Sequence, residues 1–174
     1  MGGIAAGWIA RGNRLGDPKA FGRREAVAFG ALGALADIDL LFGIHSGPTH
    51  GIGAAVLAGT AVWLPGVWHS SGALGGARIG IALACMLAYG SHILLDWLGT
   101  DTSAPIGIMA LWPFSHAYYE SGVHLFMAVS RRIWQPALFW WHNTVALARE
   151  LLILLPVVLA IGLVRRAKSV RRAR

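Results

Sequence analysis

The chain has 174 residues, of which 56% are hydrophobic and only 13% are charged. Soluble domains carry about 25% charged residues, so this composition excludes a disordered chain and favours a membrane-embedded helical one. The single cysteine excludes a disulfide framework and any zinc site built from several cysteines. The formal net charge of +7 suggests a nucleic-acid partner at first, but the positions of the basic residues argue against it.

The 15 Lys and Arg residues fall mainly into two blocks, five within positions 11–24 and six within positions 165–174. Both blocks flank long apolar stretches, as the positive-inside rule predicts for a membrane protein. A nucleic-acid-binding domain would instead need a basic face within a folded element. We therefore expect a lipid bilayer as partner and no nucleic acid. We also expect one membrane-embedded domain at 1–164, followed by a basic cytoplasmic tail at 165–174.

The apolar segments, in chain order, predict an all-α, multi-span transmembrane helical bundle with about four full spans. A short apolar helix at 1–10 comes first; it is too short to cross a bilayer unaided, because a span needs about 20 residues. The expected spans are 26–43, 52–68, 79–98 and about 145–164. If the 11–24 block is cytoplasmic, the basic tail is cytoplasmic as well. Residues 99–144 then lie outside, where three prolines predict short interfacial or re-entrant pieces.

Ionisable residues in or beside these apolar segments form a compact set. A charge inside a span costs roughly 2.5–3.5 kcal/mol and marks function by default. This set has six members. The expected topology, which rests on the basic residues alone, places all six at the outer face of the membrane. Three carboxylates and three imidazoles make a mixed oxygen and nitrogen ligand set, which suits zinc. The six candidate metal ligands are Asp37, Asp39, His45, His50, His92 and Asp96.

The spacing within two of the pairs bears on a shared site. His92 and Asp96 are four residues apart and project from one helical face. Asp37 and Asp39 are two residues apart, which is about 200° on a regular helix. Both can therefore reach one site only if the helix frays or ends there.

A tight turn is expected between the first two spans. Gly47 followed by Pro48 predicts this turn, which would fix the approach of His45 and His50. Each motif taken alone also fits a structural role, as an intramembrane hydrogen bond, a helix end or a pair of loop histidines. The histidines of the outer aromatic region are expected to pack at the interface: His116, His124 and His142.

Four motifs in this order resemble one known family. They are Asp37-Ile38-Asp39, His45 to Thr49-His50, His92 to Asp96, and Pro113-Phe114-Ser115. Over roughly residues 1–125, the chain resembles the inner-membrane-associated, metal-dependent hydrolases of the YdjM type. The resemblance implies a small multi-span protein of the bacterial inner membrane, with a divalent metal held by the six residues named above.

The chain departs from the family pattern at three places. Family members usually have proline before the first aspartate and arginine after the first histidine, where this chain has Ala36 and Ser46. Many also carry an early Thr-His pair, whereas this chain begins Met1-Gly2-Gly3. This difference predicts either one ligand fewer or a start further upstream.

These observations lead to the hypothesis of a membrane-embedded metallohydrolase acting on an ester or phosphoester. The metal would activate a water molecule, and either Asp37 or Asp96 would act as the catalytic general base. A site at headgroup depth suggests an amphiphilic substrate such as a lipid. The alternative is a non-enzymatic membrane protein whose Asp/His cluster binds or handles metal ions or protons. The cytoplasmic halves of the expected spans hold almost no polar residues, which favours a one-sided site over a conduction pathway.

Overall fold

The computed structural model describes residues 2–11, 23–44, 46–68, 75–102, 104–130 and 132–172. Over these ranges the protein is all-helical: it contains no β-strand, and its only extended pairings are two isolated bridges, Gly99 with Phe126 and Ile108 with Tyr119. The helical elements are α1 (Gly2–Arg11), α2 (Arg23–Ala34), η1 (Leu35–Phe42), η2 (Pro48–His50), α3 (Ile52–Trp68), α4 (Gly75–Trp97) and α5 (Pro136–Arg172), where η marks 3₁₀-helix.

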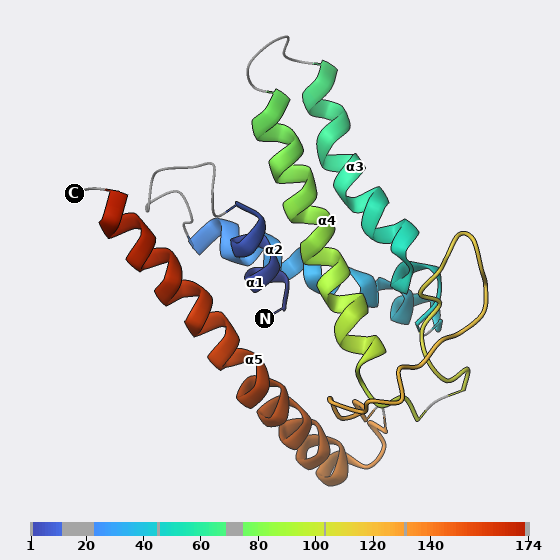
Figure 1. Cartoon of the computed structure of the whole chain (residues 1–174). Coiled ribbons are helices and arrows are strands. Elements are labelled where there is room, and N and C mark those ends of the chain that lie inside the picture. Colours follow the sequence, from blue (N-terminus) through green and yellow to red (C-terminus); the bar gives the residue numbers. More distant parts are fainter. Residues whose placement is uncertain are drawn as a thin grey trace.

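Helix α4 is the centre of the packing, because α1, α2 and α3 all contact it (Figure 1). Small residues let the backbones approach closely: Ala84 and Ala88 of α4 are fully buried. A Cβ atom on Gly3 of α1 would collide with the carbonyl oxygen of Phe29 in α2. A Cβ atom on Gly59 of α3 would lie 2.9 Å from the carbonyl oxygen of Ala82 in α4. Glycine at these crossings therefore sets the distance between the helices.

The first expected span, 26–43, is not one continuous α-helix, so the prediction of a single membrane-spanning helix there is wrong. Helix α2 ends at Ala34, and the chain tightens into the 3₁₀-helix η1 before it stops at Gly43, whose φ is +70°. A 3₁₀-helix has three residues per turn and poorer hydrogen bonds, so long runs of it are uncommon. The segment that carries Asp37 and Asp39 is thus a distinct local structure next to a short helix.

Two of the described helices are long and apolar enough to cross a membrane: α4 over Ile79–Trp97 and α5 over Pro136–Val164. The first of these matches the expected span at 79–98. Helix α3 begins at Ile52 and ends at Trp68 as expected, but its apolar part, Ile52–Leu64, is shorter than a span. The expected bundle of four full spans is therefore not confirmed, because two of the described helices are long and apolar enough to be spans.

Helix α5 is longer than the expected fourth span. Its 37 residues correspond to about 55 Å at 1.5 Å per residue, well above the roughly 30 Å of a bilayer core. Arg149, expected at the start of the span, lies well inside the helix and donates a hydrogen bond to the carbonyl oxygen of His124 at 3.4 Å. Trp134, Trp140 and Trp141 are all exposed toward the amino-terminal end of α5, consistent with interfacial anchors.

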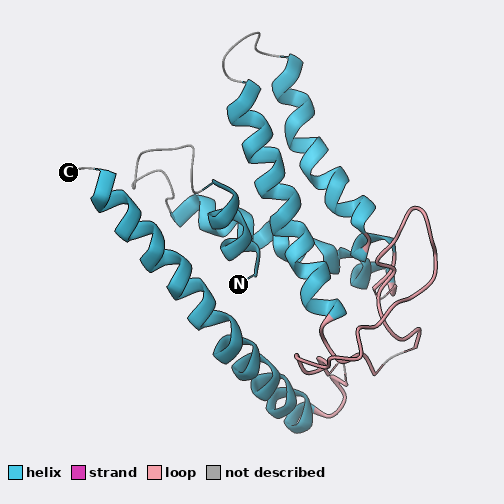
Figure 2. Cartoon of the chain, in the orientation of Figure 1, coloured by secondary structure: helices cyan, strands magenta, loops and turns pink. Residues whose placement is uncertain are grey.

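The irregular segment between α4 and α5 packs against the end of the molecule where α4 stops and α3 begins (Figure 2). The amide of Leu125 donates to the carbonyl of Leu98 at 2.7 Å, which ties the segment to the end of α4. The amide of Gly53 donates to the carbonyl of Trp112 at 2.8 Å, which ties it to the start of α3. The prediction that prolines exclude a long helix from 99–144 is confirmed for the described residues before Pro136 and is wrong from there on, because Pro136 is the first residue of the long helix α5.

Candidate metal centre

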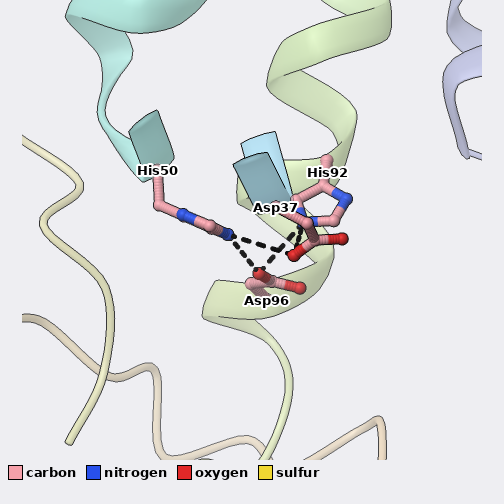
Figure 3. Close-up of side chains that lie close together, drawn as sticks. All are labelled: Asp37, His50, His92 and Asp96. Atoms are coloured by element: carbon pink, nitrogen blue, oxygen red, sulfur yellow. Dashed lines mark ion pairs between the residues drawn. The ribbon is translucent and has the colours of Figure 1, made fainter. Parts of the chain in front are cut away.

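Four side chains from three elements converge at this end of the molecule (Figure 3). Asp37 comes from η1, His50 from η2, and His92 and Asp96 from the last turns of α4. One donor atom from each residue lies within 4.8 Å of all the others, so the group could hold a metal ion. These four side chains therefore meet around one point, as the sequence motifs require for a shared metal ion.

The distances within this four-residue group are short and similar. His50 Nε2 lies 3.1 Å from Asp96 Oδ2 and 3.7 Å from Asp37 Oδ1. His92 Nε2 lies 3.2 Å from Asp96 Oδ2 and 3.4 Å from Asp37 Oδ1. Each carboxylate therefore faces both imidazoles, and each imidazole faces both carboxylates.

Asp39 lies behind His50 and is not one of the four donors. Its Oδ2 accepts a hydrogen bond from the Gly47 amide at 3.1 Å and lies 3.1 Å from His50 Nδ1. Because an ionised carboxylate only accepts hydrogen bonds, this contact keeps the His50 proton on Nδ1 and directs Nε2 at the cluster. The carboxylate is buried, with only 4% of its side chain exposed, whereas the Asp37 side chain is 45% exposed.

The 3₁₀ geometry of η1 explains this division of roles. Three residues per turn place residues two apart on different sides of the helix axis. Asp37 therefore faces the Nε2 atoms of the two histidines, while Asp39 faces the opposite nitrogen of His50. Both carboxylates therefore act on one imidazole from two directions, because residues two apart are about 120° apart around a 3₁₀-helix and about 160° apart around an α-helix.

The remaining histidines lie elsewhere or outside the described residues. His45, expected as a ligand, lies outside the described residues. His124 pairs with Glu120 at 3.6 Å, and His142 Nε2 lies 2.7 Å from the carbonyl oxygen of Ala128. Both contacts are made with the irregular segment between α4 and α5.

Charge and hydrogen bonding in the cluster both favour a cation. Burial by itself lowers the pKa of His50, but hydrogen bonds with Asp37 and Asp96, together with the charges of Asp96 and Asp39, raise it to about 9. With three carboxylates and two imidazoles, the site keeps a net negative charge even when both imidazoles are protonated.

The Nε2 atom of His92 is a direct indication that the donor set fits a metal. This atom is buried and has no hydrogen-bond partner among the described residues, although two carboxylates lie within 3.4 Å. An imidazole nitrogen that faces carboxylates without hydrogen-bond geometry is what a shared cation between them requires. Two imidazoles and two carboxylates are also the ligand types that divalent zinc takes.

Two residues near the cluster were not singled out from the sequence. Thr49 Oγ1 lies 3.2 Å from His50 Nδ1, and the Tyr89 hydroxyl donates to the carbonyl oxygen of Thr49 at 2.7 Å. Tyr89 stands three residues before His92 on α4, so the helical spacing that linked His92 to Asp96 also places Tyr89 near the site. This three-residue spacing was the sequence signal from which Tyr89 could have been predicted.

The fold and the site together define a helical protein with two candidate membrane spans and a possible Asp/His metal site at one end. A family model described as YdjM inner membrane protein matches residues 1–169. The chain therefore belongs to the YdjM inner membrane protein family, and the resemblance in the four motifs is confirmed. A search of curated proteins and a search of solved structures each found no match.

Proposed function

We propose that the protein is a membrane-embedded, metal-dependent hydrolase of esters or phosphoesters. The observation that carries the proposal is the convergence of four donor atoms within 4.8 Å of one another. Two of these donor atoms are imidazole nitrogens and two are carboxylate oxygens. Zinc takes both kinds of ligand, whereas magnesium takes oxygen ligands. Zinc is therefore the ion we propose.

The residues divide into those that would hold the ion and one that would move a proton. Catalytic zinc sites use three protein ligands and keep a position open, and we assign His50, His92 and Asp96 to the ion. Such an ion polarises a scissile ester or phosphoester bond and lowers the pKa of water toward 7. Asp37 is the most exposed of the four side chains, so its Oδ1 is the general base that accepts a proton from the attacking water. Asp39 holds His50 in the required tautomer.

An amphiphilic substrate fits the surroundings of the cluster. His92 and Asp96 lie in the last turns of the candidate span Ile79–Trp97, and this position supports a site near a membrane boundary. Next to the two aspartates, η1 exposes Leu41 and Phe42, with 82% and 74% of their surface accessible. A lipid or another ester with an apolar chain could rest on these side chains while its polar group reaches Asp37.

The proposed orientation places the site at the outer face of the bacterial inner membrane. Helix α5 starts at the end of the molecule where α4 stops and runs back along its length, so its carboxyl end lies away from the site (Figure 1). The basic residues at 165–174 follow that carboxyl end, and positive charge marks the cytoplasmic side. This placement supports a multi-pass protein whose tail is cytoplasmic.

The test is the metal content and the activity of the full-length protein purified in detergent. We expect about one divalent ion per chain in the wild type, and hydrolysis of a generic phosphodiester or ester probe that chelation abolishes and zinc restores. His92→Ala should lose the metal, whereas His116→Ala, at an exposed histidine away from the cluster, should keep it. Equal metal content in both variants would exclude the site. Metal binding without chelator-sensitive hydrolysis would favour the ion-handling alternative.

A further inference from the structure

One side chain links all three elements that carry the donors. Tyr89 lies on α4, the helix that carries His92 and Asp96, and is almost fully buried. Its ring belongs to a core cluster with Ala36, the residue just before Asp37 in η1, and with Ala55 of α3. Its hydroxyl donates a 2.7 Å hydrogen bond to the carbonyl oxygen of Thr49, the residue just before His50.

Two further hydrogen bonds hold the residues that precede Thr49 in the turn that carries His50. The Gly47 amide donates to Asp39 Oδ2 at 3.1 Å, and the Met109 amide donates to the carbonyl oxygen of Ser46 at 2.9 Å. The Tyr89 hydroxyl hydrogen-bonds the backbone of this turn to α4. The positions of His50 and of the α4 donors are thus coupled through it.

We propose that Tyr89 is a positioning residue that sets the distance between His50 and the donors on α4. The proposal rests on the metal site of the proposed function, and it assigns to Tyr89 no contact with the ion or the substrate. Partners that orient metal ligands typically change metal affinity by 10- to 100-fold when they are removed. Because Tyr89 acts on the backbone beside His50, we expect the lower end of that range.

The matched pair Tyr89→Phe and Tyr119→Phe tests this role with Co²⁺ as the probe. Phenylalanine keeps the ring in the core cluster and removes only the hydroxyl, while Tyr119 is exposed and its hydroxyl lies 3.2 Å from Ser115 Oγ, which is not one of the four donors. We expect Tyr89→Phe to bind Co²⁺ about tenfold more weakly and to shift its visible absorption bands, and Tyr119→Phe to match the wild type. A lowered unfolding temperature with unchanged Co²⁺ affinity and bands would show a merely structural role and overturn the proposal.

A second measurement leaves position 89 unsubstituted. In protein labelled with 3-fluorotyrosine, the Tyr89 resonance is identified as the signal that survives in both Tyr118→Phe and Tyr119→Phe. We expect Zn²⁺ to shift this resonance and to leave the other two in place; an unmoved Tyr89 resonance on a Zn²⁺-loaded protein overturns the proposal. A wild type that binds neither Co²⁺ nor Zn²⁺ would instead remove the proposed function itself, so the two failures are distinguishable.

Discussion

Asp39→Asn tests whether Asp39 binds the metal ion itself or only orients the metal ligand His50. The amide keeps the shape of the side chain but removes the charge that holds the His50 proton on Nδ1, across a 3.1 Å contact. Loss of such a partner lowers metal affinity by 10- to 100-fold, which corresponds to about 1.4–2.7 kcal/mol. Removal of a true ligand, as in Asp96→Asn, should cost more, because a donor atom is lost from the four-residue group.

The assay is a competition titration of Zn²⁺ against a chromophoric chelator at pH 7, with both variants and the wild type in the same detergent. We expect the order wild type, Asp39→Asn, Asp96→Asn from tightest to weakest binding. Thermal unfolding of the metal-free proteins serves as the control for folding. An Asp39→Asn protein that binds Zn²⁺ as tightly as the wild type would refute the reasoning. One as weak as Asp96→Asn would make Asp39 a ligand after all.

Three further predictions follow from other parts of the structure. The pKa of His50 is raised to about 9, and a metal ion must displace that proton. Isothermal titration should therefore show Zn²⁺ affinity rising by at least about tenfold per pH unit below pH 9; a flat profile would contradict this. Gly59→Ala forces a Cβ to 2.9 Å from a carbonyl oxygen and should lower the stability in detergent by about 1–3 kcal/mol. Gly80→Ala, with nothing within 4 Å of the new Cβ, should be neutral or stabilising; the reverse order would be inconsistent with the packing described. Phe114 is 88% exposed. In a Cys85→Ala background, the variant Phe114→Cys should react with an impermeant maleimide added from the outer side. Labelling only from the cytoplasmic side would reverse the proposed orientation.

The sequence predicted the helical class and the location of the long apolar segments well, because apolar runs and basic flanks are local signals. The start of α3 at Ile52 and the apolar stretch of α4 that begins at Ile79 agree with expectation. The spacing of Asp37 and Asp39 required the helix to fray or end near them, but the sequence did not predict a 3₁₀-helix from Leu35, since nothing in the apolar run distinguishes it from an α-helix. The start of the last span was placed too late, at about residue 145, because the apolar part of α5 begins at Pro136; its end at Val164 agrees with expectation.

Within the candidate site, the sequence predicted which residue types meet, but not which of them are donors to a metal ion and which orient a donor. The spacing of His92 and Asp96 predicts a shared helical face, and these side chains do converge with His50 and Asp37. The separate position of Asp39 depends on a tertiary contact with Gly47 and His50, which no local spacing encodes. The same holds for Tyr89, whose hydrogen-bond partner is 40 residues away.

X-ray absorption at the zinc edge of the purified, Zn²⁺-loaded protein tests the central assignment most directly. We expect a first shell of nitrogen and oxygen atoms near 2.0–2.1 Å with outer scattering from two imidazoles. A shell without imidazole scattering, or with scattering from a single imidazole, would contradict the assignment of His50 and His92 to a common ion.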